Sequence, residues 1–452
     1  VNDRLTKVIA PGSTDRRATT QYVHDDLGNL LTEISPDRGS NSYTYDNAGN
    51  VKTITDARGV LATYTYDALN RVTFLDYPGT DEDTTFTYDT CAYGRGRLCQ
   101  ALTVGGNLSH GYDAYGNVVD LSYQINNVNY VVHYSFDAGN RIKSITYPSG
   151  MIITYVRDAA GRILLITRTA GGVTTALVNN RLYRADGLLK SQTFGNNLPE
   201  TRFHDLQGRL QNQLVGSVYT RSYSLYDANG NVKQLFNSSF ANAFTLGYDY
   251  DPLDRLRQDT PSPGTLHGFD YDGNGNRKLD NAVSYIYAPN TNRLDTLGGV
   301  SVSYDAAGNI TSDAFGRSYT YDGPGRLKTA TVSSSTTTYR YNAFGQRTQK
   351  APSNKPAVYS YPGLNGELLA ETDGAGSPIV EYVYADQDPI AQIRYAPDPG
   401  TAVTAPPTVS GFWPGAGAVN TTVLVFGSGF VPGIGATTVK VNGINAPIMQ
   451  VL

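Results

Sequence analysis

Residues 43–51 read Tyr-Thr-Tyr-Asp-Asn-Ala-Gly-Asn-Val, and variants of this stretch return throughout the chain. The shared pattern is aromatic-x-aromatic-Asp, then two or three residues, Gly or Asn, Arg or Asn, and an aliphatic residue. Clear copies run over 64–72, 248–256 and 319–327. Degenerate copies run over 22–30, 110–118, 134–142, 155–163, 202–210, 224–232 and 339–347. Such self-similarity is the mark of a repeat architecture.

The spacing of the motif sets the size of one repeat. The first motif aspartates lie at 25, 46, 67, 89, 113, 137 and 158, so neighbouring motifs are 21 to 24 residues apart. A second turn signal lies about halfway between motifs, for example Pro36-Asp37-Arg38-Gly39 and Tyr147-Pro148-Ser149-Gly150. We call the first class YD turns and the second class half-period turns. Two turns per repeat leave strands of about five to seven residues, which pair as antiparallel hairpins.

The strands alternate with a period of two. In 64–66 both tyrosine rings face one side of the sheet and Thr65 faces the other. No window of 12 or more residues carries a helical period of 3.6, so we expect almost no helix. A single sheet of this many twisted hairpins has to curl. The sequence therefore predicts an all-β fold, a long spiralling antiparallel sheet of tandem β-hairpin repeats that forms a shell or tube.

The motif residues have predicted structural roles. The Asp side chain caps the tight turn by accepting backbone N–H groups, and the Gly takes the left-handed conformation. Predicted turn residues are Asp46, Gly49, Asp67, Asp113, Gly116, Asp137, Asp158, Gly161, Asp227, Gly230, Asp251, Asp272, Gly275, Asp305, Gly308, Asp322 and Gly325. Predicted face-forming aromatics are Tyr43, Tyr45, Tyr64, Tyr66, Tyr248, Tyr250, Tyr319, Tyr321, Tyr339 and Tyr341.

Composition narrows the class of partner. The 452 residues include 47 Gly and 34 Tyr, and 36 Lys and Arg stand against 40 Asp and Glu, for a net charge of −4. This balance provides no basic field for nucleic acid or anionic lipid. No apolar run approaches the roughly 20 residues that span a bilayer, so we expect no transmembrane segment. The chain opens in mid-pattern without a signal peptide, and we expect it to be an internal part of a longer protein.

The repeated Tyr-x-Tyr-Asp-x-x-Gly-Arg/Asn motif resembles the signature of the RHS or YD-repeat family over roughly residues 1–395. The resemblance implies a β-sheet that spirals into a hollow shell, as in bacterial polymorphic toxins, insecticidal toxin-complex subunits and animal teneurins. Residues 339–395 are similar to the start of the RHS-associated core, with Gly366-Glu367-Leu368-Leu369-Ala370-Glu371 carrying the likeness. The self-cleavage site and toxin that follow in toxin members are missing from this sequence.

Composition changes after Tyr395. Ala396-Pro397-Asp398-Pro399-Gly400 begins a linker, and residues 406–452 resemble part of an immunoglobulin-like IPT/TIG domain. We therefore expect YD repeats over 1–338, core-like repeats over 339–395, a Pro/Gly linker over 396–405 and a partial Ig-like β-sandwich segment over 406–452.

Two sets of residues are candidates for site chemistry. Cys91 and Cys99 flank a Gly-marked turn, which favours a disulfide in an oxidising compartment. Free buried thiols and a metal or redox role are the alternatives. Asp270, Asp272 and Asn274 match the start of a calcium loop, but the twelfth position is Asn281 instead of Glu. The same letters also form an ordinary YD turn, and we expect no cofactor.

No catalytic motif is visible, since the chain lacks G-x-S-x-G and a Walker-type loop. We therefore expect a non-enzymatic structural protein, secreted or at the cell surface of a bacterium, that encloses or displays its own C-terminal region. The alternative is an adhesion or filament-forming protein, with neighbouring copies end to end or with glycans or cell surfaces as partners. A carbohydrate-active enzyme is a third hypothesis. The tyrosine-rich face could stack glycans, hold an unfolded client, or simply cover the sheet.

Overall fold

The computed structural model describes residues 4–11, 18–79, 82–239 and 242–395, together with four strands within 408–446. Within these ranges every regular element is a β-strand, and no helix is long and apolar enough to cross a membrane. The predicted all-β fold is therefore confirmed.

One sheet holds 28 strands, and each strand pairs antiparallel with the next strand in the sequence. Its strands are β1 (Lys7–Ile9), β2 (Thr19–His24), β3 (Leu30–Ser35), β4 (Gly39–Tyr45), β5 (Val51–Thr55), β6 (Leu61–Tyr66), β7 (Val72–Asp76), β8 (Thr84–Tyr88), β9 (Leu98–Leu102), β10 (Asn107–Tyr112), β11 (Val118–Ile125), β12 (Val128–Phe136), β13 (Ile142–Thr146), β14 (Ile152–Arg157), β15 (Ile163–Ala170), β16 (Val173–Tyr183), β17 (Leu189–Phe194), β18 (Pro199–His204), β19 (Leu210–Val215), β20 (Tyr219–Tyr226), β21 (Val232–Ser239), β22 (Asn242–Tyr250), β23 (Leu256–Ser262), β24 (His267–Tyr271), β25 (Arg277–Asp280), β26 (Val283–Tyr287), β27 (Leu294–Leu297) and β28 (Val300–Ser301).

A second sheet of ten strands continues the same up-and-down order. Its strands are β29 (Ser303–Tyr304), β30 (Ile310–Ser312), β31 (Arg317–Tyr321), β32 (Leu327–Val332), β33 (Ser335–Tyr341), β34 (Arg347–Pro352), β35 (Val358–Pro362), β36 (Leu368–Thr372), β37 (Pro378–Ala385) and β38 (Asp388–Arg394). We call β1–β28 the first coil and β29–β38 the second coil. The predicted boundary between residues 338 and 339 falls inside β33, and the division into domains stays a prediction.

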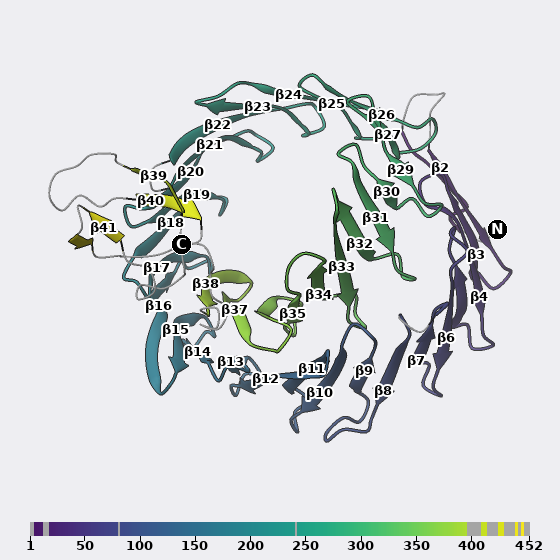
Figure 1. Cartoon of the computed structure of the whole chain (residues 1–452), viewed down its shortest axis with the longest axis horizontal. Helices are drawn as coiled ribbons and strands as arrows, with labels where there is room; N and C mark the ends of the chain where they lie inside the picture. Colours follow the sequence, from purple (N-terminus) through teal and green to yellow (C-terminus); the bar gives the residue numbers. More distant parts are fainter. Residues whose placement is uncertain are drawn as a thin grey trace.

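The two coils form a spiral (Figure 1). The first coil runs around a ring until its last strands lie beside β2 and β3, and the second coil then passes to the inside of the ring. Hydrogen bonds between the coils join residues 264, 239 and 229 positions apart in the sequence. One circuit of the spiral therefore takes about 11 repeats of the size that the motif spacing predicts.

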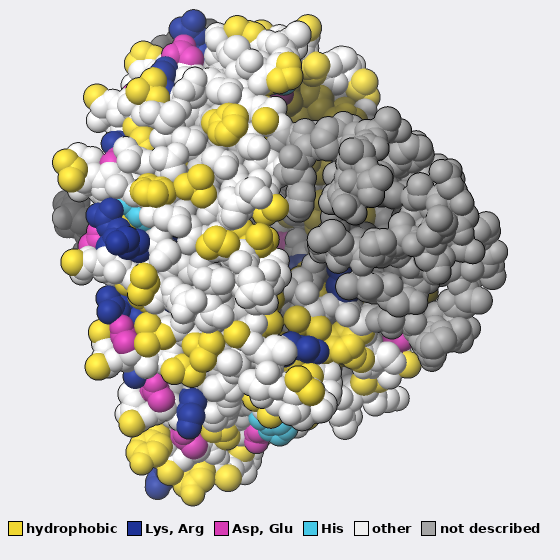
Figure 2. Space-filling view, turned by 90° about the vertical axis from the view of Figure 1, so that its left-hand side faces the viewer, with side chains coloured by type: hydrophobic (Ala, Val, Ile, Leu, Met, Phe, Trp, Pro, Cys, Tyr) yellow, Lys and Arg dark blue, Asp and Glu magenta, His cyan; other side chains and the backbone are white. Residues whose placement is uncertain are grey.

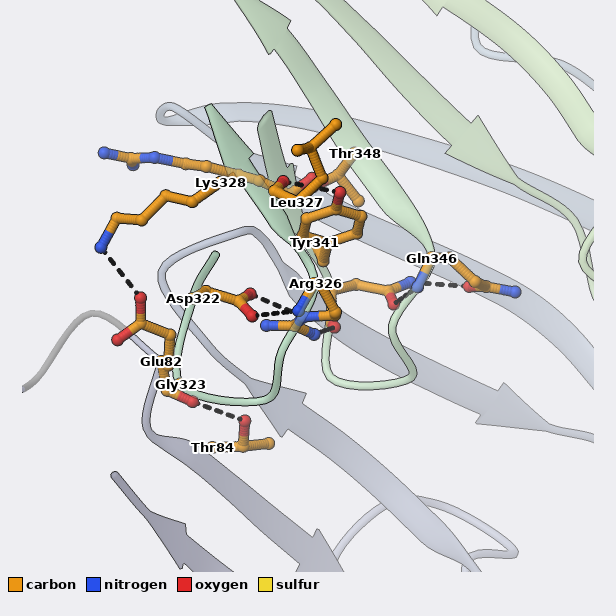
Figure 3. A network of polar contacts seen from close by, with 12 residues as sticks. Glu82, Thr84, Asp322, Gly323, Arg326, Leu327, Lys328, Tyr341, Gln346 and Thr348 are labelled. Carbon is orange, nitrogen blue, oxygen red and sulfur yellow. Dashed lines mark hydrogen bonds and ion pairs between the residues drawn. The ribbon is translucent and has the colours of Figure 1, made fainter. Parts of the chain in front are cut away.

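The coils first meet edge to edge. Because successive turns of an antiparallel sheet alternate between its two edges, all YD turns of a coil lie on one rim and all half-period turns on the other. Arg58, in a half-period turn of the first coil, donates to the carbonyls of Asp322 (2.8 Å) and Gly323 (2.6 Å) in a YD turn of the second coil. Nearby, the Lys328 ammonium lies 3.1 Å from the Glu82 carboxylate (Figure 3).

Further along, the second coil packs on the inner face of the first coil. Tyr130 stacks on Tyr361 with ring centroids 3.7 Å apart, and the hydroxyls of Tyr123 and Tyr147 donate to second-coil carbonyls at 2.7 Å. This junction of β11–β15 with β35–β37 forms the hydrophobic core and buries Met151, Ile153, Ile166, Leu369 and Val383. The face of the first coil that carries the motif tyrosines therefore points inward.

The outer face carries the residue between the two motif aromatics. These residues include Thr44, Thr65 and Ser135, which are exposed. Thr44 and Ser135 bond the hydroxyls of Thr53 and Ser144 on the neighbouring strand, whereas Thr65 pairs with Phe74. Figure 2 shows the wall from the side of β16–β21. Most of the charged side chains lie along its left-hand margin, and uncharged or apolar side chains cover most of the remaining described surface.

The C-terminal part contains two strand pairs, β39 (Thr408–Trp413) with β40 (Leu424–Ser428) and β41 (Val439–Val441) with β42 (Ile444–Ala446). The predicted linker at 396–405 and the rest of the predicted IPT/TIG-like segment lie outside the described residues. That assignment stays a prediction.

Candidate functional site

Each YD turn is closed by its aspartate. In the turn after β4, the Asp46 backbone N–H donates to the Asn50 carbonyl (2.9 Å), and the Gly49 N–H donates to the Asp46 carbonyl (3.1 Å). The Asp46 carboxylate accepts the N–H groups of Ala48 and Asn50, both at 2.9 Å. A further hydrogen bond from the Asn50 side chain helps to hold the pKa of Asp46 below its ordinary value. Gly49 has φ +84°, a conformation that favours glycine.

The same geometry recurs at every predicted turn aspartate. In each case the backbone N–H four residues later donates to the carboxylate; the aspartates are Asp46, Asp67, Asp113, Asp137, Asp158, Asp227, Asp251, Asp272, Asp305 and Asp322. The predicted turn glycines all have positive φ; they are Gly49, Gly116, Gly161, Gly230, Gly275, Gly308 and Gly325.

Neighbouring YD turns are joined by the residue at the fourth position after the aspartate, a role that we did not predict. The Asn50 amide bonds the Asn70 side chain at 2.9 Å. Arg71 pairs with its own Asp67 at 2.7 Å and with Asp89 of the next repeat at 2.5 Å. The recurrence of Asn or Arg at this position in the sequence was a signal from which this contact between repeats could have been predicted. The YD rim is thus a polar ladder that ties each repeat to the next.

The second aromatic of the motif has a specific bond that sequence reasoning missed. Its hydroxyl donates to the carbonyl of the aliphatic residue that ends the preceding motif, as Tyr66 does to Val51 at 2.7 Å. The predicted aromatics that do this are Tyr45, Tyr66, Tyr250, Tyr321 and Tyr341. These rings therefore hold successive hairpins together in addition to covering the sheet.

The first aromatic of the motif lies on the same inner face, two residues earlier. Tyr43 pairs across strands with Ile54, and Tyr64 pairs with Leu75. The partners of Tyr248, Tyr319 and Tyr339 are Asp259, Ala330 and Lys350. In the junction core, the equivalent Tyr134 and Tyr155 contact the second coil. A row of tyrosine rings thus follows the inner face around the ring.

The side chains of the three calcium candidates form hydrogen bonds or ion pairs with residues of the repeats. Asp270 pairs with Lys278 at 2.8 Å, whereas the Asp272 carboxylate accepts the Asn274 and Asn276 backbone N–H groups at 2.9 and 2.8 Å. The Asn274 side chain reaches Asn292 of the next turn at 3.0 Å. In the described part of the chain, no group of three or more Asp, Glu, His or Cys side chains is arranged to hold a metal ion.

The two cysteines form a disulfide in the structure. Cys91 and Cys99 are bonded within the turn between β8 and β9, with Cα atoms 5.6 Å apart. Gly94 lies directly against the two sulfurs, where a Cβ would be only 2.4 and 2.6 Å from them. The bond therefore closes a widened YD turn on the rim.

Comparison with known proteins identifies the repeat. The family model described as Teneurin YD-shell matches residues 209–361, and the one described as RHS Repeat matches residues 45–82 and 128–174. The tRNA nuclease WapA of Bacillus subtilis (strain 168) is 34% identical over 148 residues, which are 30% of this chain and 6% of that protein. The tRNA(Glu)-specific nuclease WapA of Bacillus subtilis subsp. natto is 35% identical over 97 residues, or 21% of this chain and 4% of that protein. The chain thus spans only a small part of these relatives.

Solved structures share the fold. The Photorhabdus luminescens Tc holotoxin pore aligns with a TM-score of 0.65 and 17% identity over 84% of this chain and 25% of that chain. TcdB2-TccC3 aligns with a TM-score of 0.64 at 16% identity over 84% of this chain and 27% of that one. TcdB2-TccC3 without its hypervariable C-terminal region gives 0.55 at 16% identity, with the same coverage. The repeated motif, the coiled hairpin sheet and the two family models together show that this chain belongs to the RHS/YD-repeat family.

Proposed function

We propose that this chain is a non-enzymatic wall segment of a hollow shell in a secreted or cell-surface bacterial protein, and that its inner face holds a polypeptide in an unfolded state. The observation that carries the proposal is the row of motif tyrosines on the inner face. Ring faces bind apolar side chains without requiring a particular sequence, which suits a client that has no fixed fold.

Hydrogen bonding on the inner face supports this proposal. Hydroxyls such as those of Tyr45 and Tyr66 already donate to the carbonyls of Leu30 and Val51, so these rings present mainly carbon. A surface of this kind offers few competing hydrogen bonds to a client backbone. The client would be the C-terminal region of a longer protein that contains this chain, by analogy with TcdB2-TccC3, which has a hypervariable C-terminal region.

The nuclease activity named for the WapA relatives is, in our proposal, not a property of this chain. The matched segment is 6% of that protein at most, so the name says little about the repeats themselves. Incubation of the purified chain with tRNA should leave the tRNA intact. Cleavage that persists in a highly purified preparation would contradict the non-enzymatic proposal.

Binding of an unfolded probe tests the shell function. A reduced, carboxymethylated globular protein cannot refold and is a suitable probe. We expect the chain to bind it and to slow its digestion by a protease, whereas the same protein in its native disulfide-bonded form should not bind. Equal behaviour of the two forms would contradict the proposal.

A pair of variants tests which face binds. Tyr64→Ser removes a ring from the inner face, and Thr65→Ala changes the adjacent residue on the outer face of the same strand. Only Tyr64→Ser should weaken protection of the unfolded probe.

A filament-forming role is favoured by a different observation, the apolar side chains on the two rims of the coil.

A further inference from the structure

The YD rim of the first coil carries apolar side chains at the tips of its turns. Five of them are 70% to 100% exposed; they are Leu27, Leu69, Tyr115, Leu206 and Leu253. Four of them are the second residue after the motif aspartate, and Leu206 is the first. A turn tip does not require an apolar residue, since Asn229 and Asn274 are the second residue after the aspartate in other repeats. Large exposed apolar residues that recur along one rim indicate a contact surface.

Within the chain, the same kind of tip already meets another coil. Phe344 is the tip of a YD turn in the second coil, and its ring lies 6.4 Å from the ring of Phe86 in the first coil. The neighbouring YD turn at Asp322 receives Arg58 from a half-period turn. The YD turn at Asp322 thus meets a half-period turn of the first coil, and the apolar tip Phe344 lies against the inner face of the first coil at Phe86.

The opposite rim offers a matching depression. A cavity of about 280 Å³ is lined by Val283, Tyr285, Leu297 and Phe315, with Asp280 and Ala314 at its border. These residues lie in or directly beside the half-period turns at 281–282, 298–299 and 313–316. Its volume is more than that of a leucine side chain. Val173, Leu266 and Val300 are further exposed apolar residues next to half-period turns.

We propose that copies of this chain stack head to tail, with the YD rim of one copy packed on the half-period rim of the next. One apolar tip of the first copy enters the cavity at Val283 and Phe315, and the other tips contact the apolar residues next to other half-period turns. The interface continues, between molecules, the coil-on-coil contact that each molecule makes internally. Because the two surfaces are different and lie on opposite rims, the contact is heterologous and generates an open stack instead of a closed dimer.

Sedimentation velocity over a range of protein concentrations tests the proposal. The wild-type chain should associate into dimers, trimers and longer stacks as the protein concentration rises. A tip variant that combines Leu69→Asp, Leu206→Asp and Leu253→Asp, and a cavity variant, Phe315→Asp, should each associate at least about ten-fold more weakly. The matched control is Leu182→Asp, a substitution at a similarly exposed leucine on the outer wall, which should associate like the wild type.

A mixing experiment separates the two surfaces. The tip variant keeps an intact cavity, and the cavity variant keeps intact tips. At a concentration where each variant alone is monomeric and the wild type associates, an equimolar mixture should form dimers and nothing larger, which also shows that both variants are folded. A wild type that stays monomeric at every concentration would overturn the proposal, and so would a tip variant that stacks like the wild type or a mixture that contains only monomers.

Discussion

Asp322 tests whether a YD turn in the coil-on-coil junction contributes more to stability than a YD turn on the free rim. Its carboxylate accepts the Arg326 backbone N–H at 2.6 Å and the Arg326 guanidinium at 2.7 Å, and the residue is only 6% exposed (Figure 3). Its backbone carbonyl accepts Arg58 of the first coil. We therefore consider the change Asp322→Ala, which removes both side-chain hydrogen bonds and leaves a largely buried guanidinium without its anion.

The expected loss is about 3 kcal/mol in the free energy of unfolding. Each hydrogen bond to a charged group contributes about 1.5–3 kcal/mol, and removal of one partner of a buried ion pair costs about 3–5 kcal/mol. We take the lower part of that range because the Arg326 side chain is 25% exposed and can gain water. The assay is urea unfolding followed by circular dichroism, together with hydrogen exchange of the junction amides.

Asp137→Ala is the matched control. Asp137 caps an equivalent YD turn with the same bonds to Arg141, but that turn lies on the free rim, where the guanidinium is 43% exposed. Asp137→Ala should destabilise the chain much less, and hydrogen exchange should rise only in its own hairpin. Equal losses for Asp137→Ala and Asp322→Ala would refute the reasoning, because they would mean that the turn alone and not the junction sets the effect.

Three further predictions concern other contacts. Burial raises the pKa of Glu381 above its ordinary value of 4.5, so the folded state binds its proton more tightly; stability should fall as pH rises above about 4.5, and Glu381→Gln should flatten this part of the pH profile of urea unfolding. Tyr66→Phe deletes the hydroxyl that donates to Val51 and should cost about 1 kcal/mol in urea unfolding, with no change in the circular dichroism spectrum. Reduction of the Cys91–Cys99 bond, which closes a loop of 8 residues, should lower the unfolding free energy by about 2.5 kcal/mol; an unchanged midpoint in dithiothreitol would contradict this.

Much of the repeat could be predicted from the sequence. The Asp46 turn, its Gly49 and the alternation of Tyr64 with Thr65 are local features that depend on residues within one hairpin. Turn capping and strand alternation act over a few residues, so a motif of nine residues contains most of the information. The contacts of Asn50 and Tyr66 were missed, because they reach a neighbouring repeat and need the register of the sheet.

The sequence by itself thus determined the repeat, the two classes of turn, the antiparallel pairing of successive strands and the need for such a sheet to curl. The division into a 28-stranded and a ten-stranded sheet was not predicted. Only the tertiary structure decided where one circuit ends, that the second-coil turn at Asp322 meets Arg58, and that β35–β38 pack inside the ring. It also decided that the tyrosine face points inward. The physical reason is that curvature is the sum of small twists over 28 strands, and no single residue specifies that sum. The coil contacts join residues 229 to 264 positions apart, a separation that the repeat motif does not encode.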